Sequence, residues 1–489
     1  MMAALATAAI TLGEVFGAAA GSLAGMKIDD LVVDSRQVKP GTGFVALPGS
    51  HGHGLDYLDD ARARGATAII YEPLEDQPRV DAPAIEIPGL SSQLGQIAKA
   101  FFGRPAAPLK LAGVTGTNGK STVAHLIAQA HTLRGIDCGY LGTLGYGVPP
   151  NLTAQTLTTP DCLSLHRTLR SLAVDYVALE VSSHALAQDR IAGLEFDTAV
   201  FTNLSQDHLD YHGTFDKYRD AKASLFGLGS LRNAVFFVDD PAASVIAKRL
   251  GPEVTRIDVS MENNADIRGR LLTSDLYGIQ LEVQGPGGLA IIKSSLVGDF
   301  NAENLLLAIG VLLAWDISLT DACDALGRCA SLPGRMQVFG GDHEAPWVIV
   351  DYAHTPAALA RVLENLQRAA TSELWCVFGC GGQRDSGKRA AMGSAAARIA
   401  NHIVLTDDNP REEDPDAIIA DIRSGIPSHP HVWVEHDRAL AISDAVCRAR
   451  VGDIVLIAGK GHERTQSIAS GEREFSDDLV VEQALEART

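Results

Sequence analysis

The sequence predicts an α/β protein of three domains, and three observations lead to this prediction. The chain has 489 residues, more than one hydrophobic core usually serves, so several domains are expected. Short apolar segments alternate with segments of helical periodicity along most of it, which favours parallel sheets covered by helices. A glycine-rich loop that ends in Lys120 and Ser121 lies between one such strand and one such helix, as in a P-loop.

The first domain is predicted over residues 1–105. Residues 1–25 are apolar but lack a basic start and are interrupted by Glu14, so we expect a helix packed on this domain and not a secretory signal. Strands are expected within 31–36, 41–49 and 66–72, with a helix over 57–65. Pro105 and Pro108 indicate a linker at the end of the domain.

The second domain is predicted over residues 106–332 and carries the P-loop-type ATPase sheet. Residues 111–116 predict a strand that enters the glycine loop, and residues 121–135 predict a helix that ends near Gly135. The apolar runs at 174–181 and 198–204 are typical of buried parallel strands.

The third domain is predicted over residues 333–489 as a doubly wound, Rossmann-like sheet. Strands are expected within 374–380, 402–408, 431–436 and 453–459, and helices over 395–401, 416–426 and 438–450. Ligands of such sheets bind beyond the carboxyl ends of the strands. Three clusters rich in charged residues, at 379–385, 406–411 and 459–463, follow predicted strands, so the third domain is expected to bind a charged ligand there.

Composition excludes some classes of protein. Hydrophobic residues make up 46% of the chain and charged residues 21%, a balance typical of soluble globular proteins. The formal net charge is −19, so no basic face is expected to bind nucleic acid. No other stretch approaches an uncharged span of about 18 to 20 residues, so we expect no membrane insertion and a cytoplasmic location. The seven scattered cysteines suit reduced thiols, and we expect Cys376 and Cys380 to be buried.

The glycine loop is the strongest single motif. Its backbone can wrap a phosphate, its lysine can reach the outer phosphates, and its serine hydroxyl can bind Mg²⁺. Val114 stands where the strict P-loop pattern has glycine, so this is a variant of the motif. The expected phosphate-binding residues are Gly116, Thr117, Asn118, Gly119, Lys120, Ser121 and Thr122.

Charged residues also follow the neighbouring strands. Glu180 ends one apolar strand, where it could hold Mg²⁺ or cap the next helix. Asp207 and His208 follow another strand, where they could bind a metal or cap a helix. Lys222 lies on a helical stretch, and its own pattern predicts an exposed surface lysine.

Taken together, these motifs resemble those of the Mur ligases in order and spacing. The shared motifs are the glycine loop and residues 180–184, 203–208, 298–304, 334–336 and 351–356, and the resemblance extends from Asp34-Ser35-Arg36 to residues 459–463. It implies an ATP-dependent, amide-forming ligase of peptidoglycan precursor synthesis, and hence a role in cell-wall biogenesis, cell shape and division. Residues 158–160, 182–190 and 408–411 look like the family member that adds meso-2,6-diaminopimelate to UDP-N-acetylmuramoyl-L-alanyl-D-glutamate.

The resemblance also implies a mechanism. The substrate glutamate carboxylate attacks the γ-phosphate of ATP to give an acyl phosphate and ADP, and the diaminopimelate amine then displaces phosphate through a tetrahedral intermediate. ATP is the co-substrate, Mg²⁺ is the cofactor, and the expected partners are small molecules bound by a monomer. The implied catalytic residues are Lys120, Glu180, His208 and Lys222. The implied metal ligands are Ser121, Glu180, His208 and Lys222, the last as a carbamate.

Three binding sets follow from the same resemblance. Beyond the glycine loop, ATP is expected to contact Asn301, Arg335, Asp351 and His354, and closure of the third domain would complete this site. The UDP-muramoyl-dipeptide set is Val33, Ser35, Ser50, His51, Gly52, Thr158, Thr159, Ser182, Gln188 and Arg190. The diaminopimelate set is Arg384, Asp408, Asn409, Pro410, Arg411, Gly459 and Glu463.

The last set has a physical rationale. Diaminopimelate differs from lysine by one distal carboxylate, which the guanidinium groups of Arg384 and Arg411 could bind in a bidentate manner. Asp408 and Glu463 could receive its ammonium groups. Lysine would leave an arginine unpaired, so it should be rejected.

The chain departs from the family pattern at three places. Gln206 stands where relatives commonly have arginine, Gln383 stands where an acid is usual, and Ser50-His51-Gly52 is an unusual version of its loop. These departures affect the details of substrate contacts.

Four alternatives remain. Two are ligases: the L-lysine-adding member of the same family and a folylpolyglutamate-synthase-like enzyme. The other two are a P-loop NTPase that hydrolyses ATP without ligation and a non-catalytic binding relative.

Overall fold

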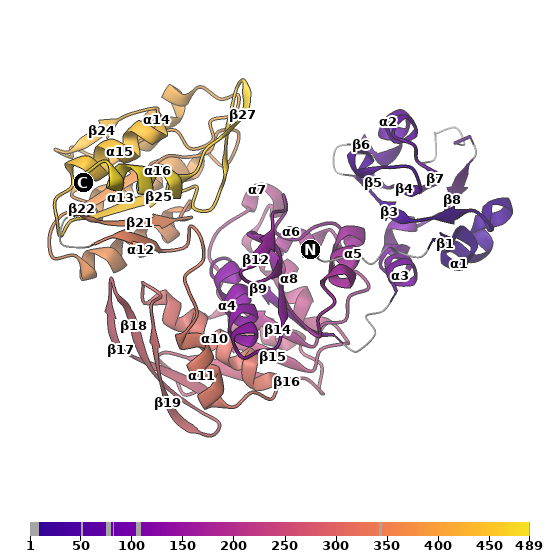
Figure 1. Cartoon of the computed structure of the whole chain (residues 1–489), viewed down its shortest axis with the longest axis horizontal. Coiled ribbons are helices and arrows are strands. Elements are labelled where there is room, and N and C mark those ends of the chain that lie inside the picture. The colour runs from indigo at the N-terminus through magenta and orange to yellow at the C-terminus, as the bar shows by residue number, and fades with distance from the viewer. Residues whose placement is uncertain are drawn as a thin grey trace.

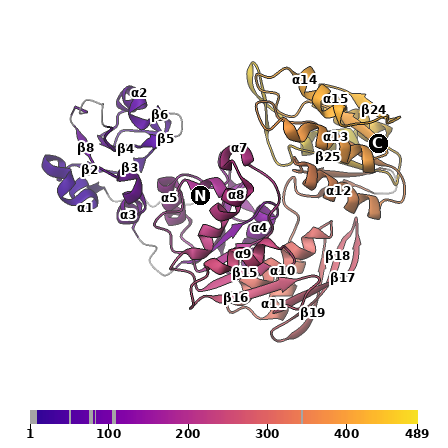
Figure 2. The ribbon, with the colours of Figure 1, turned by 180° about the vertical axis from the view of Figure 1, so that it is seen from behind.

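The computed structural model describes residues 9–49, 52–74, 80–81, 83–103, 109–341 and 345–488. The chain forms three bodies in a row, with the first and third on opposite sides of the second (Figures 1 and 2). Ser50 and His51 lie outside the described residues, as does the predicted boundary between residues 105 and 106.

The first body is a four-stranded parallel sheet in the order β3-β4-β7-β8. The predicted N-terminal helix is confirmed only in part: within the described residues it begins at Leu12, where Thr11 and Glu14 form a capping box. Leu12 and Phe16 are buried against α3. The elements are β1 (Ile10–Thr11), α1 (Leu12–Phe16), η1 (Gly17–Leu23), β2 (Lys27–Ile28), β3 (Asp30–Val32), η2 (Ser35–Gln37), β4 (Thr42–Ala46), β5 (Pro48–Gly49), β6 (Gly52–His53), η3 (Gly54–Tyr57), α2 (Leu58–Ala63), β7 (Ala68–Tyr71), β8 (Ala84–Glu86) and α3 (Leu90–Phe102).

The second body is built on an eleven-stranded sheet in the order β12-β11-β10-β13-β9-β14-β15-β16-β17-β18-β19. The strands from β10 to β16 in this order are parallel, as the long apolar runs predict. The strands are β9 (Lys110–Thr115), β10 (Cys138–Gly142), β11 (Gly145–Val148), β12 (Asn151–Thr153), β13 (Tyr176–Glu180), β14 (Thr198–Phe201), β15 (Asn233–Phe237), β16 (Thr255–Ser260), β17 (Ile267–Asp275), β18 (Gly278–Gly285) and β19 (Gly288–Ser294).

Helices α4 and α10 fill the core of this body. Helix α4 begins at Lys120, directly after the glycine loop, and α10 is buried along almost its whole length. The two pack against each other and against the sheet. The helices are α4 (Lys120–Leu133), α5 (Cys162–Leu172), α6 (Ser183–Ala187), α7 (Leu209–His212), α8 (Phe215–Ala223), η4 (Ser224–Gly227), α9 (Ala242–Ile246), η5 (Ala247–Arg249), α10 (Phe300–Ala314) and α11 (Leu319–Gly327).

The third body is a six-stranded sheet in the order β20-β21-β25-β22-β23-β24, in which only β20 is antiparallel. Helices α12, α13 and α14 cover one face, and α15 and α16 cover the other, so the doubly wound fold is confirmed. Cys376 and Cys380 are buried, as predicted. The elements are β20 (Gln337–Gly340), β21 (Trp347–Asp351), α12 (Pro356–Ala369), β22 (Leu374–Phe378), α13 (Gly387–Ile399), β23 (His402–Leu405), α14 (Pro415–Ser424), β24 (Val432–Val434), α15 (Arg438–Arg448), β25 (Ile454–Ala458), β26 (Thr465–Ile468), β27 (Gly471–Glu474) and α16 (Asp477–Glu486).

Helix α5 joins the first two bodies. It packs against α3 through Cys162 and Leu163. Arg167 donates hydrogen bonds to Asp30 Oδ1 at 3.0 Å and to the carbonyl of Leu31 at 2.6 Å. The sheet edge at β3 is thereby tied to the second body. None of the described helices is long and apolar enough to cross a membrane.

Candidate active site

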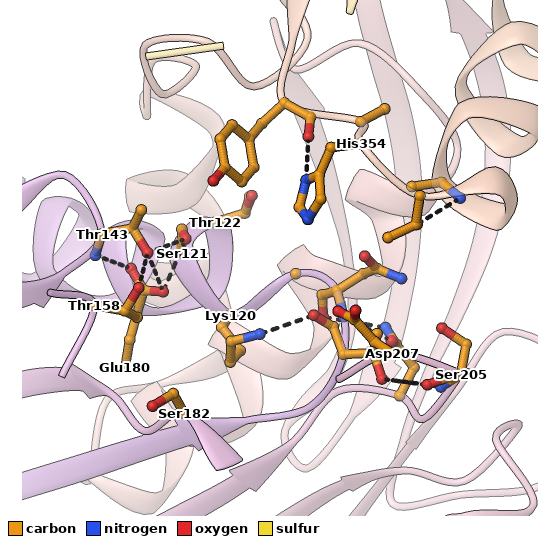
Figure 3. Close-up of a pocket in the computed structure, with 18 of the residues that line it drawn as sticks. Lys120, Ser121, Thr122, Thr143, Thr158, Glu180, Ser182, Ser205, Asp207 and His354 are labelled. Carbon is orange, nitrogen blue, oxygen red and sulfur yellow. Dashed lines mark hydrogen bonds between the residues drawn. The ribbon is translucent and has the colours of Figure 1, made fainter. Parts of the chain in front are cut away.

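A cavity of about 690 Å³ lies between the second and third bodies. The glycine loop and the ends of β13 and β14 line one side, and residues 335–336 and 351–358 line the other. Figure 3 shows Lys120 and His354 approaching this space from opposite sides. The carboxyl ends of parallel strands from two sheets therefore meet at one site.

The glycine loop takes its shape from two glycines with positive φ. A Cβ on Gly116 (φ +151°) would lie 1.9 Å from Thr202 Oγ1, and one on Gly119 (φ +84°) would lie 2.6 Å from Asn304 Oδ1. The amide of Asn118 donates a hydrogen bond to Asn203 Oδ1 at 3.0 Å. The loop is thus held close against the end of β14 and the start of α10. A side chain at Gly116 would clash with Thr202 and press on the backbone of Asn203, and one at Gly119 would require Asn304 to move.

Lys120 is folded back onto its own loop. Its Nζ donates hydrogen bonds to the carbonyls of Gly116 at 3.0 Å and Thr117 at 2.8 Å. Burial lowers the pKa of Lys120, while the nearby charge of Glu180 opposes this shift.

Glu180 lies at the end of β13 and is fully buried. Its Oε1 accepts hydrogen bonds from the Tyr140 hydroxyl at 2.5 Å and the Thr143 amide at 2.9 Å. Its Oε2 accepts from the hydroxyls of Ser121 at 2.9 Å and Thr143 at 3.1 Å. Four donors therefore fix this carboxylate and orient Ser121. Figure 3 shows Ser121 and Thr143 beside Glu180.

The donor set beside the glycine loop fits a hard cation such as Mg²⁺. The hydroxyl of Ser121 and the carboxylate of Glu180 are oxygen donors, which Mg²⁺ prefers. Because four hydrogen bonds already occupy Glu180, the residue fits a role that works through Ser121 and bound water. No group of three His, Cys, Asp or Glu side chains suited to a metal was found in the described part of the chain.

His208 follows β14 in a left-handed conformation, with φ of 52°. Its Nε2 lies 3.3 Å from Asp207 Oδ2, and its ring lies 4.8 Å from that of His184. Burial lowers the pKa of His208 to about 4, although Asp207 opposes the shift. The ring is therefore neutral near pH 7, the form in which histidine binds a metal.

Lys222 is not a surface residue, so the prediction from its local pattern is wrong. Only 1% of it is exposed, because α8 packs behind the glycine loop. Its Nζ donates a hydrogen bond to the carbonyl of Gly116 at 2.6 Å and lies 4.5 Å from the ring centre of Tyr218. Burial, and then the charge of Lys120, hold the pKa of Lys222 well below its ordinary value.

The third body contributes Arg335, Asp351 and His354 to the same cavity. Arg335 Nη2 donates to Ser121 Oγ at 3.3 Å, which is a direct contact between the two bodies. The guanidinium also lies 4.5 Å from the ring centre of Tyr352. Arg335 is therefore already beside the glycine loop in the arrangement observed.

Asp351 is buried and His354 is half-buried, and backbone groups hold both side chains. Asp351 accepts hydrogen bonds from the amides of Met336 and Ala353, each at 2.8 Å, and burial raises its pKa. His354 Nδ1 lies 2.8 Å from the carbonyl of Tyr352. Because a carbonyl only accepts, Nδ1 carries the hydrogen, and the neutral ring that burial favours presents Nε2 as an acceptor.

Asn301 lies on α10 at the edge of this cavity. Its Nδ2 donates to the carbonyl of Val297 at 2.8 Å, and its Oδ1 accepts from Asn304 Nδ2 at 2.9 Å. All of the residues expected to bind ATP line the cavity except Gly116, whose carbonyl oxygen accepts hydrogen bonds from both Lys120 and Lys222.

The residues expected to bind the UDP-linked substrate fall in two places. Thr158, Thr159, Ser182 and Arg190 line the cavity. Gln188 Oε1 accepts from Arg190 Nε at 2.9 Å. Val33, Ser35 and Gly52 lie in the first body, beside β3 and in β6, away from this cavity. Ser50 and His51 cannot be placed because they lie outside the described residues.

The residues expected to bind the amino acid follow three adjacent strands, β22, β23 and β25. Asn409 Nδ2 donates to Glu463 Oε2 at 2.9 Å, which joins two of the loops. A Cβ on Gly459 (φ +112°) would lie 2.6 Å from Asp408 Oδ2. The backbone of Pro410 packs against Gly382, where a Cβ would lie 2.0 Å from the Pro410 carbonyl.

Arg384 and Arg411 lie in these loops. Arg411 Nη1 donates to the carbonyls of Gly382 at 2.7 Å and Asn409 at 3.4 Å. Burial, and then the charge of Arg384, lower the pKa of Arg411. Within the described residues, neither guanidinium forms an ion pair with a carboxylate, so together they offer an unneutralised site for an anion. Arg384 also lines the main cavity.

Three contacting residues were missed by the sequence analysis. Tyr140 and Thr143 hold Glu180, and Thr143 could have been found because it follows a buried strand as Glu180 does. Lys460 is fully buried, and its Nζ donates to Asn409 Oδ1 at 2.9 Å and Glu463 Oε2 at 2.8 Å. No signal in the local pattern distinguishes it from an exposed lysine.

Comparison with protein families gives three matches along the chain. Residues 27–102 match the model described as the Mur ligase family, catalytic domain. Residues 114–312 match the Mur ligase middle domain, and residues 334–461 match the Mur ligase glutamate ligase domain.

Curated relatives and solved structures agree with these matches. UDP-N-acetylmuramoyl-L-alanyl-D-glutamate–2,6-diaminopimelate ligases of Xanthomonas oryzae pv. oryzae and Chromobacterium violaceum are 45% and 43% identical, over 95% of each chain. A solved structure of a ligase with the same name has a TM-score of 0.70 at 36% identity, over 98% of this chain and 99% of that one. MurF from Acinetobacter baumannii also has a TM-score of 0.70, at 16% identity over 99% and 100% of the two chains, a likeness of fold alone.

Proposed function

Because the chain belongs to the Mur ligase family, we propose that it is the ATP-dependent ligase that adds meso-2,6-diaminopimelate to UDP-N-acetylmuramoyl-L-alanyl-D-glutamate in peptidoglycan precursor synthesis. The family matches, the curated relatives and the shared three-part α/β fold all point to this reaction. The observation that carries the substrate assignment is the pair Arg384 and Arg411, two guanidinium groups without a carboxylate partner among the described residues, next to Asp408 and Glu463.

The two steps of the reaction need different parts of the site. In the first step, the glutamate side-chain carboxylate of the acceptor attacks the γ-phosphate of ATP, giving an acyl phosphate and ADP. The glycine loop supplies backbone amides to the phosphates, and Lys120, now bonded to its own loop, is close enough to exchange those carbonyls for phosphate oxygens. Arg335 and His354 close the opposite wall and help to exclude water from the acyl phosphate.

In the second step, an amine of diaminopimelate attacks the acyl phosphate and displaces phosphate through a tetrahedral intermediate. The attacking amine must be neutral, and its proton leaves with the phosphate. We expect Asp408 and Glu463 to receive ammonium groups of the amino acid. Arg384 lies both in the amino-acid cluster and on the cavity wall, which supports a path from one site to the other. The donors around the cavity stabilise the negative charge that develops on the intermediate.

We propose Mg²⁺ as the cofactor, held by Ser121, His208 and Lys222, with Glu180 acting through Ser121 and bound water. When bound, Mg²⁺ would neutralise phosphate charge and draw the transferred phosphoryl group into line. A carbamate on Lys222 would turn a cation into an anion, and burial, which lowers the pKa of Lys222, favours the neutral amine that can react with CO₂. The remaining proposals are a cytoplasmic location, a monomer and small-molecule partners.

The domain limits of residues 1–105, 106–332 and 333–489 stay proposals, as do the substrate roles of the individual residues. The UDP end of the acceptor would contact Val33, Ser35 and Gly52, and the peptide end would contact Thr158, Thr159, Ser182, Gln188 and Arg190. The contact of α5 with the first body supports one continuous binding path between these two sets.

The proposal is tested by phosphate release from ATP with UDP-N-acetylmuramoyl-L-alanyl-D-glutamate and either meso-diaminopimelate, L-lysine or no amino acid. We expect release and tripeptide product with diaminopimelate alone. Turnover with lysine would still support a ligase but would contradict the role of Arg384 and Arg411 in selecting diaminopimelate. Release without any amino acid would favour an NTPase.

A second measurement addresses the arginine pair. Arg411→Lys keeps the charge but loses the planar fork, so KM for diaminopimelate should rise by roughly tenfold or more while KM for ATP stays unchanged. The control is Arg423→Lys on α14, an exposed arginine of the same body.

A further inference from the structure

Two loops carry Arg384 and Arg411, and these loops are joined through their backbones. The amide of Gly382 donates to the carbonyl of Asn409 at 2.9 Å. Residues next to or within the charged pair adopt left-handed backbone conformations, with φ of 53° at Gln383 and 55° at Arg411. Non-glycine residues keep such conformations only where the surrounding contacts hold them.

The two arginines also repel each other. The charge of Arg384 contributes to the lowered pKa of Arg411, which means that the guanidinium groups are near enough to interact. The charges of Asp408 and Glu463 oppose this effect of Arg384 on the pKa of Arg411. The hydrogen bond between Gly382 and Asn409 and the contact of Arg411 with the Gly382 carbonyl already join the two loops, and one further contact adds to them.

Glu413 provides that contact. It lies two residues after Arg411, and its Oε2 accepts a hydrogen bond from the amide of Gln383 at 2.7 Å, directly before Arg384. One carboxylate therefore ties the second loop to the first. Because Glu413 binds the backbone amide of Gln383, this tie does not depend on the side chain at that position.

The side chain of Arg389 fixes the carboxylate of Glu413. It lies in the first turn of α13 and is only 1% exposed. Its Nη1 donates to Glu413 Oε1 at 2.6 Å and its Nη2 donates to Glu413 Oε2 at 2.8 Å, a two-pronged contact. Nη2 also lies 3.4 Å from the carbonyl of Gly381, in the Arg384 loop. Hydrogen bonds from Arg389 lower the pKa of Glu413 to about 2, so Glu413 stays charged at neutral pH.

Arg389 makes one further contact, with a residue outside the two loops. Nη1 also donates to Asp421 Oδ2 at 3.0 Å, on α14. Asp421 is half exposed and touches neither loop through this bond. The guanidinium of Arg389 thus makes one contact that joins the two loops and another that joins α13 to α14. Each contact can be removed by a substitution of its own.

We propose that Arg389 is a positioning residue for amino-acid selection. Through Glu413 it fixes the spacing of Arg384 and Arg411, and this spacing determines how well the distal carboxylate of the substrate is bound. Arg389 touches no substrate itself. The inference rests on the proposed function, because it concerns the recognition of a diamino acid with an additional carboxylate.

The test measures KM for each of the three substrates in Arg389→Lys and Glu413→Gln. Arg389→Lys keeps the positive charge but cannot make the two-pronged contact. Glu413→Gln removes the negative charge at a partly exposed position, where we expect the substitution to be compatible with folding. We expect KM for diaminopimelate to rise on the order of tenfold in both variants, because small displacements of a binding group are costly. KM for ATP and for the UDP-linked acceptor should stay within about twofold, and the preference for diaminopimelate over L-lysine should fall.

The matched control is Asp421→Asn, which removes the α14 contact of the same guanidinium and should leave every KM within about twofold. A merely structural Arg389 would lower the fraction of active enzyme and leave the KM values and the preference for diaminopimelate unchanged, which would overturn the inference. If Arg389→Lys does not fold, Glu413→Gln decides by the same criterion. A wild-type enzyme that does not use diaminopimelate would instead contradict the proposed function.

Discussion

Lys222 donates a hydrogen bond from its side-chain amine to the carbonyl oxygen of Gly116 at 2.6 Å, although 106 positions separate them in the sequence. A helix lysine thereby lies directly behind the phosphate-binding loop. The amine is buried and sits close to a second lysine, Lys120, so its neutral form is favoured. This is the form required for carbamylation.

Lys222→Arg is therefore expected to lower kcat by roughly 10²- to 10³-fold, since arginine keeps a cation where the reaction needs an anion. The measurement is steady-state phosphate release with all substrates, together with ¹³C NMR of the wild type in labelled bicarbonate. Lys217→Arg, on the exposed side of the same helix, is the control and should retain full activity. Full activity of Lys222→Arg would contradict the carbamate.

Glu180→Gln should have a small effect on stability and a large effect on the rate of the reaction. The hydroxyls of Ser121 and Thr143 can rotate and accept from a glutamine amide, so we expect only about 1–3 kcal/mol of lost stability. The charge that orients Ser121 is lost, and we expect kcat to fall by about 10²-fold or more with a higher requirement for Mg²⁺. Chemical denaturation and Mg²⁺ titration of the rate measure the two effects. An unchanged Mg²⁺ titration would contradict a role for Glu180 near the cation.

Gly116→Ala should abolish ATP binding. Its Cβ would lie 1.9 Å from Thr202 Oγ1, so the loop would have to move away from β14. The control is Gly135→Ala at the end of α4, which also has positive φ (+88°) but no atom within 4 Å of the new Cβ. Both variants carry backbone strain, of about 1 kcal/mol in the control, but only the first has the clash. Calorimetric titration with ATP should show binding by the control alone; equal binding by both would exclude the steric argument.

His436 gives the third body a pH-dependent contribution to stability. Its Nδ1 lies 2.8 Å from Asp407 Oδ1 and its Nε2 lies 3.1 Å from Asp416 Oδ1, and the hydrogen bond to Asp407 is the main cause of its raised pKa. A raised pKa in the folded state means that the stabilisation is fully present below the ordinary pKa of histidine, and is lost as pH rises through the folded-state value.

We therefore expect His436→Gln to lower Tm more at pH 6 than at pH 9, by on the order of 1–2 °C because the side chain is partly exposed. Thermal denaturation at the two pH values measures the difference. The control is His429→Gln, which removes a histidine whose hydrogen bonds are to the backbone of Ala400 and His431 and not to a carboxylate. An equal effect of His436→Gln at both pH values would refute the contribution of the two carboxylates.

The local sequence pattern correctly predicted those helices and strands whose formation depends on neighbouring residues in the chain. The helix expected over 121–135 is α4 (Lys120–Leu133), and the strand expected within 174–181 is β13 (Tyr176–Glu180). Both elements are buried along almost their whole length, so the signal in the sequence is a nearly continuous apolar run, bounded in α4 by the glycine loop and Gly135. The sequence also indicated which strand ends carry the site, because parallel strands end on one side of a sheet.

The antiparallel strands β17 to β19 were not predicted, although turn signals at Gly278 and at residues 285–288 separate alternating segments there. The start of α13 was also missed, because its first turn is polar and its orientation is determined by Arg389 binding Glu413. The local pattern predicts an exposed position for Lys222 and gives no sign that Lys460 and Arg389 are buried. Their burial depends on partners far away in sequence, which no periodicity reveals.

The contact of Arg167 with Asp30 and Leu31 has a consequence for the length of the acceptor. It holds the first body at a set separation from Thr158 and Thr159, which directly precede α5. An acceptor anchored at both places must span that separation. An acceptor with one residue too few or too many would then not bind at both places at once. Its length alone would exclude it, and no side chain would need to contact the missing or additional group.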